Sequence, residues 1–259
     1  MYTKIFLRIA IVLFFGLMMV GCGMKTLVDI YMEPVASGNE HLDAKTGALT
    51  LEKEGVSITV KPLNTSDLLM LTNDKDINPY IDVTFWGHAN PLYTVFDINI
   101  HNNSESKVVI NSPAILIDEN NGEQYESLSY DYFKDIYGVA YRRRPERVYP
   151  YYWRVYPYGW DEYSYPYDWD RYPYPYYYPP YYRDVYNENR ERRLVTRKTI
   201  FDGAKLFSGA KRNGLLVFEK LDEGATDVRL VIPEVVVYNG EKKQELNFEF
   251  NFRQVVFVK

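Results

Sequence analysis

Apolar and polar residues alternate with a period of two over several stretches in the first half of the chain. The alternation is clearest over residues 56–60, 81–85 and 96–100, where Val, Ile or Phe occupies every second position. This pattern is typical of strands that place one side in a core and the other in water. Residues 108–117 form a further apolar stretch, and Pro113 within it predicts an edge, a bend or two short strands.

The same pattern returns near the end of the chain, over residues 214–221, 228–238 and 246–258. The last stretch has the most regular alternation, with an apolar residue at every second position from 246 to 252. Asn239-Gly240, which precedes it, is a dipeptide typical of tight hairpin turns. Strands at this spacing, without a convincing helix between them, predict an all-β fold, an antiparallel β-sandwich.

We expect one sandwich domain that is split by a long insertion. Neither block of strands can bury both of its faces alone, whereas together they hold about 150 residues, which is enough for a core. The predicted organisation is a signal peptide over residues 1–21, a tether over 22–45, the split sandwich over 46–130 and 195–259, and an insertion over 131–194. Two separate domains are the alternative.

Three motifs stand out in these strands: an extended strand that ends in Asn, a hairpin led by Asp, and a strand led by Gly. Their residues are Phe96-x-Ile98-x-Ile100-x-Asn102-x-Ser104, then 108–117 with Asp118 and Gly122 to Tyr125, and Gly209-x-x-x-x-Gly214-x-x-Val217-Phe218. Together they resemble the immunoglobulin-like domain of unknown function found in many bacterial lipoproteins, which implies an immunoglobulin-like antiparallel β-sandwich. The insertion before the third motif departs from the family pattern. The resemblance implies a non-catalytic binding or structural module with no catalytic residues to transfer.

Tyr and Pro make up about two-thirds of residues 149–182. The Tyr-Pro pairs recur at uneven spacing, which is typical of a low-complexity segment, and proline favours polyproline II or irregular turns. Clustered Tyr and Trp bury much area at low conformational cost and can stack on sugar rings. The alternative is an exposed loop without a partner, because loop-closure entropy grows slowly with length. The candidate binding residues are Tyr151, Tyr152, Trp153, Tyr158, Trp160, Tyr167, Trp169 and Tyr176.

Arginines flank the aromatic segment on both sides. The candidate basic patch consists of Arg142, Arg143 and Arg144 before it and Arg192 and Arg193 after it. In a chain of net charge −5 this is a local reversal of sign, which could engage lipid headgroups, phosphorylated glycans or an acidic partner. We favour the alternative that these arginines stack on neighbouring tyrosines and pair with nearby carboxylates, which holds the ends of the insertion together.

A basic and apolar leader precedes the only cysteine. Lys4 and Arg8 are followed by an apolar run over residues 9–20, which is too short to span a bilayer comfortably. Met19-Val20-Gly21-Cys22 resembles the lipobox of bacterial lipoproteins, although Met19 stands where leucine is commonest. The resemblance implies cleavage before Cys22, a diacylglycerol thioether on Cys22, and a fatty acid such as palmitate on its amino group. An uncleaved or ordinarily cleaved signal is the alternative.

The expected location is the cell envelope, with the protein held in a membrane by its N-terminal lipid. In lipoproteins an aspartate after the cysteine commonly retains the protein at the inner membrane; Gly23 stands there, which favours the outer membrane. The periplasmic or the surface side stays open. Loss of Lys4 and Arg8 with the leader changes the net charge from −5 to −7. Such a charge argues against nucleic acid and against electrostatic adhesion to anionic lipid.

The sequence predicts neither a metal site, nor a cofactor, nor catalysis. The three histidines share no ligand spacing, and a single cysteine cannot form an intramolecular disulfide. No nucleophile elbow or glycine-rich phosphate loop is found. The expected function is a non-catalytic lipoprotein that displays an aromatic loop to bind a ligand or partner, with a glycan as one candidate. The alternative is a structural subunit of an envelope protein complex.

Overall fold

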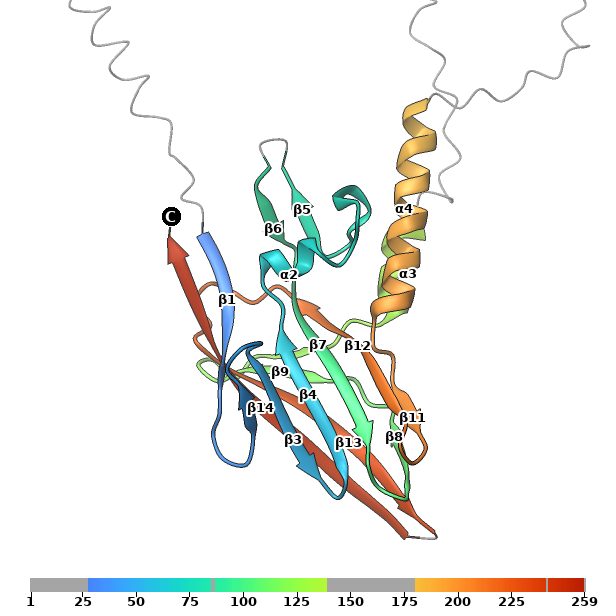
Figure 1. The fold of residues 1–259 in the computed structure, drawn as a ribbon. Coiled ribbons are helices and arrows are strands. Elements are labelled where there is room, and N and C mark those ends of the chain that lie inside the picture. Colours follow the sequence, from blue (N-terminus) through green and yellow to red (C-terminus); the bar gives the residue numbers. More distant parts are fainter. Residues whose placement is uncertain (1–27, 85–86, 139–179, 241, 259) are drawn as a thin grey trace, which may run out of the picture.

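Two antiparallel β-sheets pack face to face in the computed structural model of this chain (Figure 1). The model describes residues 28–84, 87–138, 180–240 and 242–258. The predicted all-β sandwich is confirmed, since strands account for most of the ordered chain and every pairing between named strands is antiparallel. Within the described residues, no helix has the length and the apolar character needed to cross a membrane.

The five-stranded sheet has its longest strand near the middle. Its strand order is β12-β7-β4-β3-β2, with β12 at Lys211–Glu219, β7 at Tyr93–Asn102, β4 at Val56–Pro62, β3 at Ala48–Lys53 and β2 at His41–Asp43. The alternation along β7 divides its side chains between two cores. Phe96, Ile98 and Ile100 face the second sheet, whereas Val95 faces the opposite side.

The seven-stranded sheet is organised around two long strands at the end of the chain. Its main order is β1-β14-β13-β8-β11, with β9 on β13 and β10 on β9. The bounds are β1 Val28–Val35, β14 Lys242–Val258, β13 Asp227–Asn239, β8 Lys107–Ile110, β11 Ala204–Leu206, β9 Ile115–Asp118 and β10 Gln124–Glu126.

The main core lies between these two sheets. Phe248, Phe250 and Phe252 of β14 are at most 1% exposed, as the regular alternation of this strand predicts. The Phe96 ring meets that of Phe252 at a centroid distance of 5.0 Å and that of Phe218 at 5.9 Å. Burial of one such side chain stabilises the fold by roughly 1.5–3 kcal/mol, so this aromatic layer is a principal source of stability.

Pro113 separates two short strands that pair with successive parts of one long strand. β9 pairs with β13 over residues 228–231, and β8 pairs with it over residues 235–238. The register of β13 shifts between these two parts, where Glu234 has a positive φ of 52°. The Ser112 hydroxyl donates a hydrogen bond to the Glu234 carboxylate and joins the two irregularities. Of the three predicted outcomes at Pro113, the structure therefore has two short strands.

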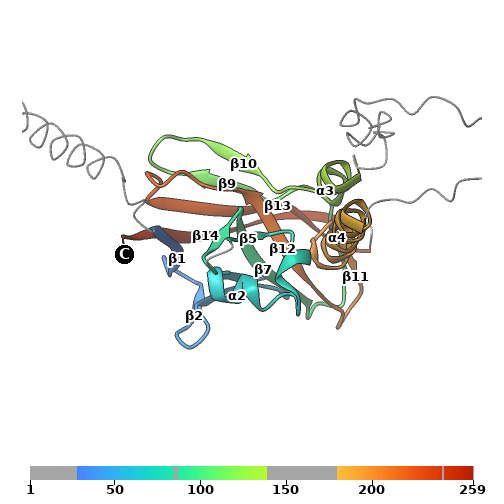
Figure 2. The same cartoon turned by 90° about the horizontal axis from the view of Figure 1, so that it is seen from above.

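Smaller elements form a third layer on the outer side of the five-stranded sheet (Figures 1 and 2). They are α2 (Thr65–Leu69), the 3-10 helix η1 (Lys75–Ile77), the hairpin β5 (Ile81–Val83) and β6 (Ala89–Pro91), α3 (Tyr130–Gly138) and α4 (Pro180–Thr199). The predicted strand over residues 81–85 is thus a strand over Ile81–Val83 in this separate two-stranded sheet, and Phe85 lies outside the described residues.

Two predicted boundaries need correction. The proposed tether over residues 22–45 contains β1 and β2, and β1 pairs with β14 along its whole length. The insertion over 131–194 contains α3 and most of α4, although no convincing helix was expected. Residues 139–179 lie outside the described part of the chain.

Candidate functional site

The helices α3 and α4 flank the aromatic segment and pack against each other, and we call this pair the helical base. In α3, Tyr130, Phe133 and Tyr137 follow the spacing i, i+3, i+7 and therefore share one face. Phe133 is fully buried on that face, whereas Ile136 on another face is 44% exposed. The base is therefore a sequence-encoded amphipathic element that docks on the sandwich.

Aromatic rings attach the helical base to the outer side of the five-stranded sheet. Phe133 meets Tyr80 and Tyr93 edge to face at centroid distances of 6.0 and 5.3 Å. It also contacts Tyr132 at 5.1 Å and stacks with Tyr137 at 6.3 Å. Each such pair adds about 0.5–1.5 kcal/mol beyond the area it buries. These five residues, the tyrosine cluster, fix α3 to the sandwich.

Hydrogen bonds complete this attachment. The Tyr80 hydroxyl lies 2.6 Å from Oγ1 of Thr199 at the end of α4, and the Tyr137 hydroxyl donates to the Pro79 carbonyl at 3.3 Å. Burial raises the pKa of the Tyr80 phenol well above its usual range, and the Thr199 contact offsets only part of this effect. Burial likewise raises the pKa of Tyr93. Both phenols therefore stay neutral in the folded protein.

Arg192 of α4 also attaches the helical base to its neighbours. Its Nε donates a hydrogen bond of 2.9 Å to the Asp76 carbonyl within η1, and its guanidinium lies over the Tyr137 ring at 6.0 Å. For this residue the contacts agree with the expected stacking on a neighbouring tyrosine. Arg193 is half-buried in the same helix, and its carbonyl accepts a hydrogen bond from the Thr196 hydroxyl at 2.9 Å.

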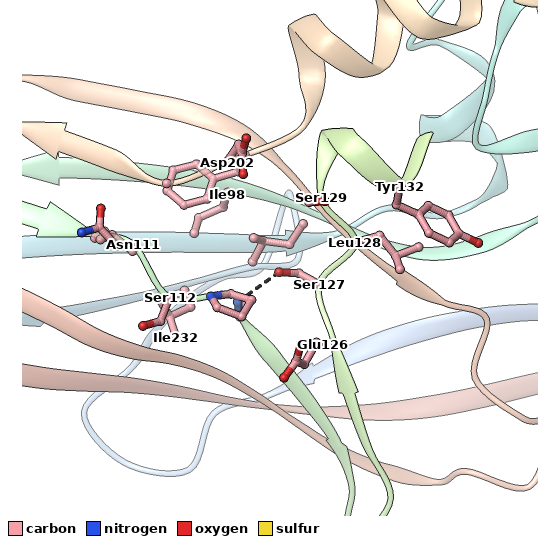
Figure 3. A pocket seen from close by; sticks show the side chains of 16 residues that line it. Ile98, Asn111, Ser112, Glu126, Ser127, Leu128, Ser129, Tyr132, Asp202 and Ile232 are labelled. Atoms are coloured by element: carbon pink, nitrogen blue, oxygen red, sulfur yellow. Dashed lines mark hydrogen bonds between the residues drawn. The ribbon is translucent and has the colours of Figure 1, made fainter. Parts of the chain in front are cut away.

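A cleft opens beside the helical base, where the two sheets separate around Pro113 (Figure 3). Its volume is about 420 Å³. Ile98, Leu216 and Ile232 form an apolar floor that continues the main core. The rim is polar, with Ser112, Ser127, Ser129, Asn111, Glu126 and Asp202, and Tyr132 of α3 closes one side.

The cleft is a built part of the fold. Ser127 Oγ accepts the Ala114 backbone N–H at 3.0 Å across it. Gly214 lies behind Phe201, and a Cβ at this glycine would approach the Phe201 Cβ to 2.9 Å, so only glycine permits this packing. An apolar floor with hydroxyl and carboxylate groups at its rim can accept a small apolar group that carries hydrogen-bond donors.

The predicted binding residues are only partly placed. The eight aromatic candidates, Arg142, Arg143, Arg144 and Cys22 all lie outside the described residues. Arg192 and Arg193 are described, and Arg192 contacts the tyrosine cluster. The sequence reasoning missed the cluster itself, because residues 131–194 were treated as one biased segment. The helical spacing of its apolar residues in α3 was the available signal.

Asn102, which ends the strand of the first family-like motif, has a structural role. It is completely buried, and its Nδ2 donates to the Ser106 carbonyl at 2.7 Å. Its Oδ1 accepts the backbone N–H of Ser104 at 3.0 Å and the Ser104 hydroxyl at 2.6 Å. Over the described part of the chain, no three His, Cys, Asp or Glu side chains are grouped so that they could hold a metal ion.

Comparison with known proteins does not assign a function to this chain. No protein-family model, no curated protein and no solved structure matches this chain. The resemblance in the strand motifs and in the lipobox therefore stays an expectation, and function has to be argued from the chemistry of the site.

Proposed function

We propose that this chain is a non-catalytic, lipid-anchored protein of the cell envelope that presents its Tyr/Pro-rich insertion for binding of a ligand or partner. The observation that carries this proposal is the helical base. Both ends of the insertion start from helices that are fixed to the sandwich by the buried tyrosine cluster. A loop that is merely tolerated needs no such attachment.

A fixed base favours binding for a thermodynamic reason. Association loses conformational freedom in the partners, and a loop whose two ends are already held loses less of it. The described ends of the insertion, Gly138 and Pro180, belong to two helices that pack against each other. Tyr and Trp then supply contact area with few rotatable bonds.

The proposed ligand class is a polysaccharide of the envelope, because indole and phenol rings stack on the apolar faces of sugar rings. The test is retention of the membrane-extracted protein on isolated cell-wall or surface polysaccharide. We expect retention to be lost when Trp153, Trp160 and Trp169 are all changed to Ala. The matched control is Phe207→Ala, an exposed aromatic residue of the β11–β12 turn. Undiminished retention of the triple variant contradicts the glycan proposal.

The proposed anchor is tested by intact-mass analysis of the protein extracted from membranes, beside a Cys22→Ala form. We expect loss of residues 1–21 and an acyl mass on Cys22, because thioether and amide acylation leave a defined mass increment. An unmodified Cys22 contradicts the anchor. Recovery of one defined protein partner after crosslinking in membranes, without polysaccharide retention, favours a structural subunit instead.

A further inference from the structure

The strands β1 and β14 continue beyond the sandwich as a two-stranded ribbon. β13 pairs with β14 only as far as Arg253, opposite Asp227. Beyond that point β14 pairs with β1 alone, from Gln254 opposite Met32 to Val258 opposite Val28. We call residues 28–32 and 254–258 the terminal ribbon. It lies at the end of the molecule where β1 begins (Figure 1).

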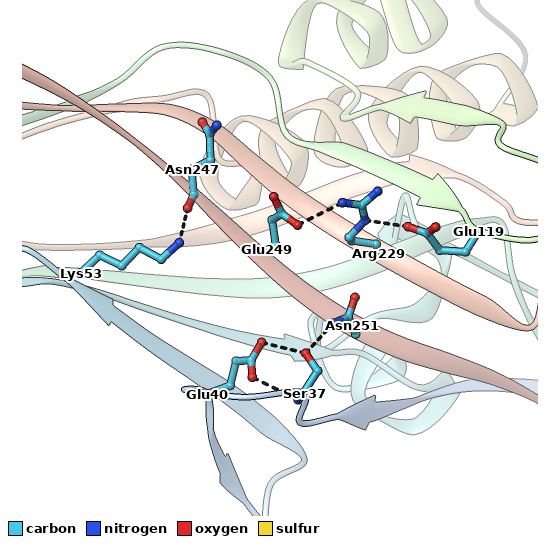
Figure 4. A network of polar contacts seen from close by, with 8 residues as sticks. All are labelled: Ser37, Glu40, Lys53, Glu119, Arg229, Asn247, Glu249 and Asn251. Atoms are coloured by element: carbon cyan, nitrogen blue, oxygen red, sulfur yellow. Dashed lines mark hydrogen bonds and ion pairs between the residues drawn. The ribbon is translucent and has the colours of Figure 1, made fainter.

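The pattern of side chains along β14 changes where the ribbon begins. Inside the sandwich its solvent side is polar, with Asn247, Glu249, Asn251 and Arg253. These residues join a polar network in which Arg229 bonds Glu119 and Glu249, and Asn251 bonds Ser37 (Figure 4). After Gln254 the sequence is Val-Val-Phe-Val, without alternation. A continuous apolar strand is typical of one that is covered on both faces.

The described residues cover the end of the ribbon only in part, although Gln254 at its start is buried and Met32 packs against the main core. Phe257 is 50% exposed on the side that is polar in the sandwich, and Val256 is 37% exposed on the other. The Tyr31 ring stacks on that of Phe257 at 5.5 Å with an interplanar angle of 10°. Two-stranded ribbons are marginally stable in water, so an apolar one is stabilised by whatever surface covers it.

We propose that a lipid surface covers the terminal ribbon, so that Tyr31, Val256 and Phe257 lie in the interface of the membrane that holds the protein. This inference rests on the proposed acylation of Cys22. Six residue steps separate Cys22 from Val28, and even a fully extended chain spans only about 20 Å over them. The ribbon therefore cannot lie far from the lipid.

The chemistry of the ribbon fits this surface. Tyrosine is enriched at the membrane–water interface, and Phe and Val side chains gain free energy when they enter the acyl boundary. The charged residues Glu33 and Arg253 are exposed and lie on the sandwich side of the apolar residues, while Asp29, the partner of Phe257 in the strand register, is the one charged residue within the ribbon. The apolar contact needs no anionic lipid, in agreement with the acidic character of the chain.

The proposed contact fixes how the domain stands on the membrane. The first turn of α4 lies at the same end of the molecule as the start of β1 (Figure 1), and Figure 2 looks down on this end with β1 and α4 on opposite sides. At that end α4 and the strands β5 and β6 reach beyond the start of β1, whereas the β13–β14 turn lies at the opposite end, farthest from the lipid (Figure 1). This differs from the tether predicted from the sequence, which would let the domain stand clear.

The test uses the full acylated protein in neutral phosphatidylcholine vesicles. Acylation blocks the only natural thiol, so an introduced cysteine accepts a single nitrobenzoxadiazole label. Val256→Cys reports on the ribbon and leaves the Tyr31–Phe257 stack in place. Gln244→Cys, exposed near the other end of β14, is the matched control about 40 Å away along the strand. Quenching by doxyl lipid and by aqueous iodide is then compared, after intact mass has confirmed the acyl group.

We expect the label at 256 to be quenched severalfold more by doxyl lipid than the label at 244, and to be shielded from iodide. Adding Phe257→Glu should restore access of iodide to residue 256, whereas Tyr238→Glu, in β13 beside the β13–β14 turn, should not. Iodide access at both positions in an acylated protein overturns the inference and leaves the anchor standing. Shielding at 256 without lipid quenching shows that protein covers the ribbon, which also overturns it. A Cys22 without acyl mass overturns the proposed anchor and this inference with it.

Discussion

Two stretches of β14 show how one strand meets two environments. Residues 246–253 alternate between buried phenylalanines and a polar outer side; they pair with β13, and residues 251–253 pair with β1 as well. Residues 254–258 pair with β1 as their only strand neighbour, although the Gln254 backbone N–H bonds the Thr226 carbonyl, and from Val255 on the residues of β14 are all apolar. The pairing with β1 runs unbroken from Asn251 to Val258, across the point of change, so the change reflects the surroundings and not the backbone.

The difference shows that alternating apolar and polar residues and a continuous apolar run indicate different surroundings of a strand. Regular alternation marks a strand with one side in water, whereas a run of apolar residues marks a strand that is covered on both sides. In the first stretch the protein itself supplies the cover. In the second stretch the described chain covers Phe257 only in part, through the Tyr31 ring, and this is what makes the terminal ribbon a candidate contact surface.

The largest expected effect is in the covered stretch. Phe250→Ala should lower the free energy of unfolding by about 3–5 kcal/mol, because it leaves a cavity between the two sheets. Phe250 is fully buried. Urea denaturation of the chain without residues 1–22 measures the change. A loss below about 1 kcal/mol would show that the sandwich core is not packed as described.

A smaller loss of unfolding free energy is expected for a change at Asn102, a buried polar residue at the end of the sandwich opposite the ribbon. Asn102→Leu should cost about 1–3 kcal/mol, because the Ser106 carbonyl and the Ser104 N–H lose their partner. The same denaturation assay checks this value, with Asn103→Leu, an exposed neighbour, as the matched control. Equal losses of unfolding free energy in the two variants would contradict the structural role of the Asn102 hydrogen bonds.

Tyr80, a buried residue of the tyrosine cluster, should make the stability of the fold sensitive to alkaline pH. The folded-state pKa of Tyr80 is raised above the unfolded value of about 10, so the unfolded state loses its proton first. The contribution is complete below pH 10 and is lost as the pH rises above it. Thermal unfolding between pH 8 and 11 should show this decline. In Tyr80→Phe the decline should be shallower; an unchanged slope contradicts the assignment.

The smallest effect is expected in the uncovered stretch. In the water-soluble chain without residues 1–22, Phe257→Ala should change the free energy of unfolding by no more than about 0.5 kcal/mol, as is usual for exposed positions. Denaturation beside the Phe250→Ala variant gives the direct contrast within one strand. A loss as large as that of Phe250→Ala would mean that the ribbon belongs to the core.

The sequence predicted the parts of the fold whose pattern was regular. The alternation in β4, β7, β13 and β14 identified these strands, and Asn239-Gly240 marked a turn where Gly240 has a φ of 63°. β1 was missed although Val28, Ile30 and Met32 alternate with polar residues, because Pro34 and the Ser37-Gly38-Asn39 turn residues close behind it suggested a tether.

The candidate site was less predictable, because it depends on contacts between segments that are distant in sequence. The cluster joins Tyr80, Tyr93 and Phe133 from three separate elements, and no local pattern reveals their meeting. The cleft depends on the match between the break at Pro113 and the register shift in β13, which only the pairing of strands defines. By contrast, the helical spacing of apolar residues within α3 could be detected in the sequence. It was missed because the Tyr/Pro-rich segment that follows dominated the interpretation of this region.

Amide hydrogen exchange tests the central comparison most directly. Exchange of the acylated protein on vesicles is compared with that of the same chain without residues 1–22 in water. The account predicts that amides of residues 28–32 and 254–258 exchange more slowly on vesicles, because the lipid surface stabilises the ribbon, while those of residues 246–252 exchange alike in both states. Equal exchange of the ribbon in the two states would contradict it.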